Sequence, residues 1–430
     1  KQVVTGAVAF DARGLVIKQW APYFDTTSTT YRSVSLVSGL ASPVSYSYDP
    51  LGRLIETTDP DGSKTLVNYN DAETTTTLAN NTQTEKTVDV YGRLIKVEEV
   101  VSDTQSHVTS YDYDTLNNLT KVTDSAGNIT TITYDSLGRK LSMTDPDMGH
   151  WTYAYDAVDN LTSQTDARGV ATNFTYDALN RVTQKSYTIP AGSGIANPGA
   201  VIYTYDSATQ QFAKGKLTSI SDGSGSSSFE YDNLGRLVKE SKAIDGTTYT
   251  IQRAYDLLGR LTSLTYPDNE VAAYTYNNQG GIETVTLQAP SSTPQAIVTD
   301  VTYNAAGQLT KIVYGNGVVS DYSYNPQTLR LSQLITRNSQ LATLQDFSYA
   351  FDAVGNVSAI TDRVHTATQT FQYDPLNRLK QATGSYGTSS YGYDAIGNMT
   401  SKEGVAMTYG LPDGTKPHAV TATSDGWTLK

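Results

Sequence analysis

One short phrase that returns at a fixed spacing constrains the fold of this chain more than any other feature. Each copy is an aromatic residue, an Asp, a few turn residues and a hydrophobic residue, and it follows the copy before it at a constant interval. The regularly spaced copies begin at Tyr113, Tyr134, Tyr155 and Tyr176. A fixed period of this length is typical of repeat proteins, in which each unit packs on its neighbours. We therefore interpret the chain as an array of small, similar units.

The copy over residues 128–150 predicts two strands and two turns. Residues 128–134 alternate and are rich in Thr and Ile, which is typical of a half-buried strand. The turn over 135–138, here named the YD turn, begins with Asp, which accepts backbone hydrogen bonds, and ends with Gly, which adopts positive φ. A second strand over 141–144 leads to the closing turn over 145–149. About 21 residues hold all four elements, which leaves no room for a helix.

Sixteen copies can be counted from Phe10 onward, at intervals of between one and two repeat lengths. We predict one continuous array over residues 1–430, with a degenerate first repeat and loop over 1–47, a long inserted loop over 188–200 and a truncated tail over 412–430. Within the first of these segments, the Thr/Ser-rich stretch 26–35 is expected to be a loop. The predicted structural positions of the repeat are Tyr48, Asp49, Gly52, Arg53, Tyr113, Asp114, Tyr134, Asp135, Gly138, Arg139, Tyr155, Asp156, Tyr176, Asp177, Tyr231, Asp232, Gly235, Arg236, Tyr255, Asp256, Gly259, Arg260, Tyr373, Asp374, Tyr393, Asp394 and Gly397.

The strand before each Tyr-Asp pair often carries a second aromatic residue two positions earlier. In Trp151, Tyr153 and Tyr155 the rings share one face, while Thr152 and Ala154 point to the other. We expect rings of neighbouring repeats to stack, and the small polar face to suit the inside of a shell. About 32 strands at ~4.8 Å give a ribbon about 150 Å long, whose edges would be exposed if it stayed flat. The predicted fold is all-β: a spiralling strip of antiparallel β-hairpins wound into a hollow shell or barrel.

Composition excludes several classes of function. The net charge of −12 and the pI near 4.8 argue against binding to nucleic acid or to anionic membrane surfaces. No apolar run approaches the ~18 residues of a membrane-spanning helix, so we expect no membrane insertion by this segment. The absence of Cys excludes a disulfide framework. Because the sequence starts with Lys1 rather than Met, we expect it to be part of a longer protein.

No pattern in the sequence indicates catalysis, a cofactor or a metal. The repeated Asp is read as a turn residue, and the repeated Arg as a bridge between turns. The turns at 59–62 and 145–147 faintly resemble a calcium loop but lack its later ligands. No G-x-S-x-G, P-loop or dinucleotide-binding motif is present. The four histidines fall in different repeats without paired spacing, at His107, His150, His365 and His418.

The Asn-Leu-Thr sequences at Asn118 and Asn160 and the Asn-Ile-Thr sequence at Asn128 match the glycosylation acceptor pattern. They also follow from the repeat itself, because Asn is common at the end of its turns.

The Y-D-x-x-G-R-L phrase, fullest at Tyr48, Tyr134, Tyr231 and Tyr255, resembles the YD repeat of the Rhs family. That family includes bacterial Rhs polymorphic toxins, shell components of ABC insecticidal toxin complexes and, more distantly, the teneurins. The resemblance covers nearly the whole chain and implies a hollow shell of β-hairpins that encloses a toxic C-terminal effector. Bacterial shells of this kind usually end in an acidic autoprotease segment. No counterpart is found near this C-terminus, so cleavage is not carried over.

We therefore predict a non-enzymatic β-shell segment of a large bacterial Rhs-type toxin, secreted or extracellular and without cofactors. Its expected partners are an enclosed effector polypeptide and other shell or toxin components of a longer chain or complex. The alternative is an extracellular carbohydrate- or cell-surface-binding adhesion module of teneurin type. Its contacts would come from the outer surface, the loop over 188–200, or the aromatic residues Trp20 and Trp427.

Overall fold

The computed structural model describes residues 2–25, 42–411 and 413–428. Every regular element among these residues is a β-strand, as the sequence predicted. The described part of the chain accordingly contains no helix that could span a membrane. The loop expected over 26–35 lies outside the described residues.

The strands follow one another at short intervals along the chain. They are β1 (Gln2–Val4), β2 (Val8–Phe10), β3 (Val16–Gln19), β4 (Tyr23–Asp25), β5 (Val44–Tyr48), β6 (Leu54–Thr58), β7 (Lys64–Asn70), β8 (Glu73–Thr77), β9 (Gln83–Val88), β10 (Leu94–Ser102), β11 (Gln105–Tyr113), β12 (Leu119–Thr123), β13 (Ile129–Tyr134), β14 (Lys140–Asp145), β15 (Gly149–Tyr155), β16 (Leu161–Thr165), β17 (Ala171–Tyr176), β18 (Val182–Thr188) and β19 (Val201–Tyr205). They continue as β20 (Leu217–Asp222), β21 (Gly225–Tyr231), β22 (Leu237–Ile244), β23 (Thr247–Tyr255), β24 (Leu261–Thr265), β25 (Val271–Tyr276), β26 (Ile282–Gln288), β27 (Gln295–Tyr303), β28 (Leu309–Tyr314), β29 (Val319–Tyr324), β30 (Leu331–Arg337), β31 (Thr343–Phe351), β32 (Val357–Asp362), β33 (Ala367–Tyr373), β34 (Leu379–Gly384), β35 (Gly387–Tyr393), β36 (Met399–Lys402), β37 (Val405–Tyr409) and β38 (Val420–Thr423).

The strands form one antiparallel strip in chain order. β2 pairs with β3, β3 with β5, and from β5 each strand pairs with the next as far as β38, while β1 and β4 form a small separate sheet. The ladders joined by a YD turn shift register beside the repeat aromatic, as between Thr133 and Tyr134, so a β-bulge accompanies the turn. Among the described strands no ladder joins β2 to β38, so the strip is a spiral rather than a hydrogen-bonded ring.

The strip contains two more hairpins than the sixteen copies counted in the sequence. One is β7–β8, whose Tyr69 takes the aromatic position one repeat length after Tyr48. The other is β37–β38, with Tyr409 in the same position. The double-length interval that the sequence suggested between Tyr48 and Val88 is therefore two repeats. The predicted total of about 32 strands was too low, because the strip itself holds 36.

The wall is a single layer, with few buried side chains. Ten described residues are buried, five of them apolar, and the accessible surface is 25187 Å². A compact monomer of 46.5 kDa would expose about 16,000 Å². The excess surface is what a wall with two exposed faces produces. Stability must therefore come from the ladders and from contacts between neighbouring repeats, rather than from an apolar core.

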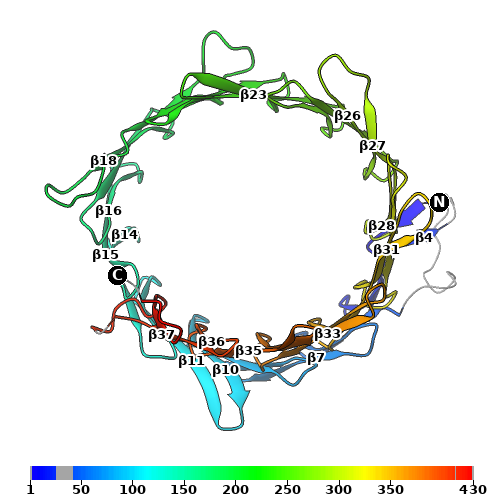
Figure 1. The fold of residues 1–430 in the computed structure, drawn as a ribbon. Helices are drawn as coiled ribbons and strands as arrows, with labels where there is room; N and C mark the ends of the chain where they lie inside the picture. Colours follow the sequence, from blue (N-terminus) through cyan, green and yellow to red (C-terminus); the bar gives the residue numbers. More distant parts are fainter. Residues whose placement is uncertain (1, 26–41, 412, 429–430) are drawn as a thin grey trace.

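The strip winds into a ring and then passes over its own beginning. Figure 1 shows the last strands, β33 to β37, beside β7, β10 and β11. We call the first turn of the spiral, which contains β7, β10 and β11, the first coil, and the part of the strip that lies beside it, which contains β33 to β37, the second coil. Contacts between coils join residues 267 to 297 positions apart, which corresponds to about 23 to 25 strands in a full coil. At ~4.8 Å per strand the ring is at least about 35 Å across, and the wall thickness leaves about 25 Å free inside. Barrels of 16–18 strands already leave a water-filled lumen, so this coil is hollow.

Candidate functional site

The YD turn is held by its first residue, as Asp135 illustrates. The backbone N–H of Asp135 donates to the carbonyl of Arg139 (2.9 Å), and Gly138, at φ 78°, donates back to the Asp135 carbonyl (3.0 Å). The carboxylate oxygen Oδ1 accepts the backbone N–H groups of Leu137 and Arg139, both at 2.9 Å. One side chain thus closes the turn from inside. Asn277 makes the same two bonds through its amide oxygen, so the turn needs an acceptor rather than a charge.

The Arg that ends the turn ties one repeat to the next. Arg139 donates from Nε to Oδ2 of Asp135 (2.7 Å) and from Nη1 to the carbonyl of Asp156 (3.1 Å) in the following YD turn. Its guanidinium carbon also lies 5.1 Å from the ring centre of Tyr155. The same Arg-over-ring contact joins Arg53 to Tyr69, Arg93 to Tyr113, Arg181 to Tyr205, Arg236 to Tyr255, Arg260 to Tyr276, Arg330 to Phe351 and Arg378 to Tyr393.

This contact differs from the ring-on-ring stacking that the sequence suggested. Aromatic residues of successive repeats lie on alternate strands, about 9.6 Å apart. Stacked rings need centres about 4.5–7 Å apart, so a gap remains between them. The planar guanidinium lies over the next ring in this gap and retains its hydrogen bonds to Asp and to the backbone.

The repeat aromatic adds a hydrogen bond of its own. The hydroxyl of Tyr276 donates to the carbonyl of Leu261, which lies six residues after Tyr255 of the previous repeat (2.7 Å). Ten other tyrosines donate in the same direction to the preceding repeat: Tyr48, Tyr113, Tyr176, Tyr231, Tyr255, Tyr303, Tyr324, Tyr373, Tyr393 and Tyr409. The Asp and the aromatic residue of a repeat, together with the Arg or other residue that ends its turn, therefore form what we call the repeat clasp.

Asn replaces Arg in some clasps, and this accounts for the glycosylation-like sequences. The side-chain amides of Asn118 and Asn160 donate to Oδ2 of the Asp that opens their turn, both at 2.9 Å. Asn128 makes the same bond to Asp124 in a closing turn (2.7 Å). The nitrogen to which a glycan would be attached is thus engaged within the turn.

Hydrogen bonds from the turn backbone lower the pKa of three clasp carboxylates. For Asp135, Asp177 and Asp256 the first cause is the bond from the backbone N–H four residues on, partly opposed by desolvation. A folded pKa below the ordinary value of 3.8 means that the stability contribution is complete above that pH and is lost as pH falls through the folded pKa. These carboxylates lie near solvent, so each contributes modestly, and the effect depends on their number.

We therefore expect the urea midpoint of unfolding to be nearly constant between about pH 5 and 8 and to fall below about pH 4. The variant Asp135→Asn/Asp177→Asn/Asp256→Asn should show a shallower fall, because Asn accepts the same backbone bonds without titrating, as Asn277 does. Urea titrations of both proteins across this pH range measure the slope. A midpoint that rises toward low pH, or equal slopes in the two proteins, would contradict this assignment.

The two coils meet along a seam, defined here as the contact of first-coil closing turns with second-coil YD turns and the C-terminal segment. Thr82 Oγ1 donates to the carbonyl of Pro375 (2.6 Å), and Ser125 Oγ to that of Ala395 (2.7 Å). Further bonds join Asn80 to Asn377 (3.1 Å), Gln327 to the carbonyl of Pro60 (3.3 Å), Lys416 to the carbonyl of Pro146 (2.8 Å) and His418 to Asp147 (2.6 Å). The seam thus recurs along the overlap of the two coils and makes their wall continuous.

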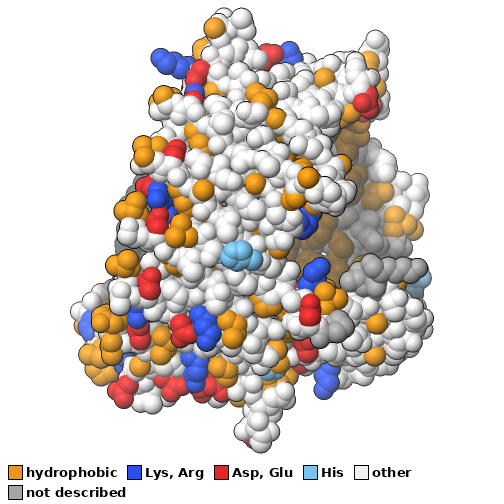
Figure 2. All heavy atoms as spheres, turned by 90° about the vertical axis from the view of Figure 1, so that its left-hand side faces the viewer, with side chains coloured by type: hydrophobic (Ala, Val, Ile, Leu, Met, Phe, Trp, Pro, Cys, Tyr) orange, Lys and Arg blue, Asp and Glu red, His pale blue; other side chains and the backbone are white. Residues whose placement is uncertain are grey.

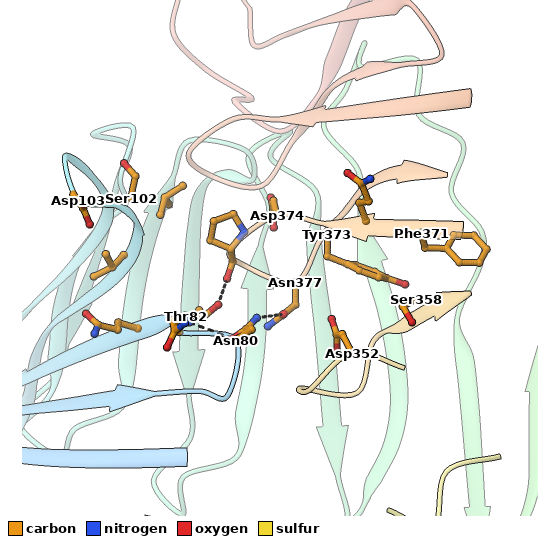
Figure 3. A pocket seen from close by; sticks show the side chains of 16 residues that line it. Asn80, Thr82, Ser102, Asp103, Asp352, Ser358, Phe371, Tyr373, Asp374 and Asn377 are labelled. Atoms are coloured by element: carbon orange, nitrogen blue, oxygen red, sulfur yellow. Dashed lines mark hydrogen bonds between the residues drawn. The ribbon is translucent and has the colours of Figure 1, made fainter. Parts of the chain in front are cut away.

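One cavity in the wall is part of this seam. It has a volume of about 680 Å³ and lies between the β8–β9 turn, the β10–β11 turn and the β33–β34 turn. Figure 3 shows Asn80 and Thr82 bonded across it to the turn that carries Asn377. The carboxylates of Asp352 and Asp374 are engaged by backbone N–H groups of their own turns. The cavity is a polar gap between docked turns, without a set of converging catalytic groups.

The residues weighed for metal binding have structural partners. Oδ1 of Asp61 accepts bonds from Ser63, and Oδ1 of Asp145 from the backbone of Asp147. Three histidines are bonded: His150 to Thr144, His365 to Asp362 and His418 to Asp147. Buried His107 has an Nδ1 without a hydrogen-bond partner. Within the described ranges no group of three or more acidic, His or Cys residues is arranged to hold a metal ion.

The outer face seen in Figure 2 is mostly uncharged, with hydrophobic side chains scattered among acidic and basic ones. Of the two tryptophans suggested for surface recognition, Trp427 is half exposed and Trp20 lines a cavity with Pro22 and Leu329. They lie at opposite ends of the chain.

Two family profiles match most of the repeat array. The Teneurin YD-shell profile matches residues 66–245, and the RHS Repeat profile matches residues 10–64 and 351–389. The chain belongs to the Rhs/YD-repeat family. The repeat clasp is therefore the structure that the Rhs/YD phrase encodes here. Among curated protein sequences, none matches the chain.

Solved structures similar to this Rhs/YD chain are toxin complexes. The crystal structure of TcdB2-TccC3-Cdc42 superposes with a TM-score of 0.85 at 21% identity, over 95% of this chain and 24% of that one. TcdB2-TccC3 without its hypervariable C-terminal region gives 0.84 at 21%, over 95% and 24%. The Tc holotoxin pore of Photorhabdus luminescens gives 0.83 at 22%, over 93% and 23%. At these identities the likeness shows the shared shell fold. This chain spans about a quarter of the length of those chains.

Proposed function

We propose that this Rhs/YD segment is a structural, non-catalytic part of a shell that encloses and shields a polypeptide, and that it acts outside the bacterium that makes it. The observation that carries the proposal is the seam. Closing turns of the first coil bond to YD turns of the second, so the wall around the lumen is continuous over the overlap. A free width of about 25 Å admits an extended or helical chain, since a helix with its side chains is about 10–12 Å wide.

Two further observations support enclosure over surface recognition. The lumen is formed by the whole wound strip, whereas Trp20 and Trp427 do not form one platform on the outer face. The similar toxin structures include a complex solved without a hypervariable C-terminal region. We infer that a variable effector polypeptide is the enclosed partner, and that other shell or toxin components of a longer chain or complex are further partners of this segment. Carbohydrate binding remains the alternative.

Protease protection tests the proposal. An unfolded guest of about 50 residues with one site for a sequence-specific protease is fused to the C-terminus. A protease of about 240 residues has a radius of gyration of about 18 Å and is wider than the lumen. We expect cleavage of the fused guest to be at least about ten-fold slower than cleavage of the free guest peptide.

The matched control is a folded guest of about 200 residues with the same site in an exposed loop. It is too wide for the lumen, so its site should be cut at the rate measured for the free folded guest. Equal rates for the free and fused unfolded guests would overturn enclosure by this segment.

A further inference from the structure

In each YD turn that carries an apolar residue two positions after the Asp, the exposure of that side chain depends on the coil. It is half-buried in the second coil and exposed in the first. In the second coil Val354, Leu376 and Ile396 occupy this position and are half-buried where they face the first coil. Eight first-coil turns carry an apolar residue there, from Leu51 to Leu258, and these side chains are 62–79% exposed. One position of the repeat is therefore covered where coil lies on coil and open elsewhere. We call this open row the free rim.

The seam shows what covers this position. Beside Leu376, Thr82 of a closing turn donates to the carbonyl of Pro375. Beside Ile396, Ser125 of another closing turn donates to the carbonyl of Ala395. In both cases an apolar side chain and a backbone carbonyl of a YD turn face the closing-turn edge of another coil. The free rim presents the same two groups in the same order, so it is continuous with an interface already formed in this molecule.

The two edges left outside the seam match in length. The seam uses closing turns over about 59–148 and YD turns over about 325–398. The YD turns before residue 308 and the closing turns after residue 166 lie outside it. Partners across the seam are 267–297 residues apart, which is the length of one coil, and each outside edge is about as long. A second spiral can therefore continue the first with the same offset.

We propose that the free rim is a docking surface for the closing-turn edge of a second copy of this chain, stacked head to tail on the same axis. Specific interfaces bury about 800 Å² per partner, which eight turns reach when each contributes about 100 Å². The contact joins two different edges, so it leaves one of each open at the ends and does not close. Stacking then continues to longer tubes as concentration rises. This inference rests on the seam and is independent of whether a guest is enclosed.

The test is sedimentation velocity of the purified chain over a range of concentrations. We expect the average mass to rise with concentration, through dimers to longer species. The variant Leu137→Gln/Leu179→Gln/Leu234→Gln should weaken this association at least about ten-fold. Gln is compatible with the turn, because Gln279 occupies the same position in the turn that begins at Asn277. An unchanged urea midpoint would show that the variant folds.

The matched control is Leu66→Gln/Leu141→Gln, which changes two exposed leucines on strands β7 and β14 of the wall. It should associate like the unmodified chain. A chain that stays monomeric at every concentration would overturn the proposal, as would association that survives the rim substitutions or that the wall substitutions abolish. Binding to lipid vesicles that is lost in the rim variant, with self-association unchanged, would assign the rim to a membrane surface and equally overturn it.

Discussion

Replacing Tyr276 with alanine is expected to lower the free energy of unfolding by about 2–4 kcal/mol, the range for removing a large packed side chain. The half-buried ring lies under Arg260, whose guanidinium carbon is 4.5 Å from its centre, and its hydroxyl donates to the carbonyl of Leu261. The truncation therefore opens one repeat clasp. Because repeats contact only their neighbours, hydrogen exchange should accelerate most in β24 and β26.

Two companion variants separate the contributions of Tyr276. Tyr276→Phe removes the hydroxyl alone and should cost about 1 kcal/mol. Tyr249→Ala removes a ring that is 48% exposed on β23 and should change stability by less than about 0.5 kcal/mol. Urea unfolding of the three variants measures these differences. If Tyr276→Ala were as mild as Tyr249→Ala, the clasp would not be what holds the wall together.

The substitution Gly225→Ala should lower the free energy of unfolding by about 3–5 kcal/mol. Gly225 begins β21 at φ 145°, a conformation that side chains rarely adopt. A Cβ there would overlap the carbonyl oxygen of Ala243 on the neighbouring strand β22. This atom belongs to the backbone, so relief requires the β21–β22 ladder to open, and Gly225 pairs with Ile244 at its end.

The matched control is Gly259→Ala in a YD turn. Gly259 also has positive φ, at 82°, but a Cβ there meets nothing within 4 Å. Only the left-handed strain remains, so we expect a loss of about 1–2 kcal/mol. Thermal unfolding of the two variants gives the comparison. Equal losses would show that the close approach between β21 and β22 does not restrict this position.

The local structure of each repeat was readable because a few residue types determine it. Tyr134 ends a strand, Asp135 and Gly138 form the turn, and both requirements are local to the chain. The copy at Tyr69 does not match the repeat phrase, because Asn70 replaces the Asp and the β7–β8 hairpin turns within two residues. Its signal was the spacing, since Tyr69 follows Tyr48 by one repeat length.

Contacts between repeats could be anticipated only in part. The sequence indicated that Arg139 bridges turns, but the distance between alternate strands, which puts Arg139 over the ring of Tyr155, became clear only from the strip geometry. No pattern in the sequence indicated which turns meet at the seam. Thr82 and Pro375 are 293 residues apart, and the curvature that brings them together is the sum of small twists over about 25 strands.

Enclosure is tested most directly by cryo-electron microscopy of the chain fused to the unfolded guest of about 50 residues. We expect the ring in Figure 1 to appear as a closed wall with added density inside its lumen, compared with the unfused chain. Added density outside the wall, or a ring whose coils separate along the seam, would contradict the proposal that this segment encloses a polypeptide.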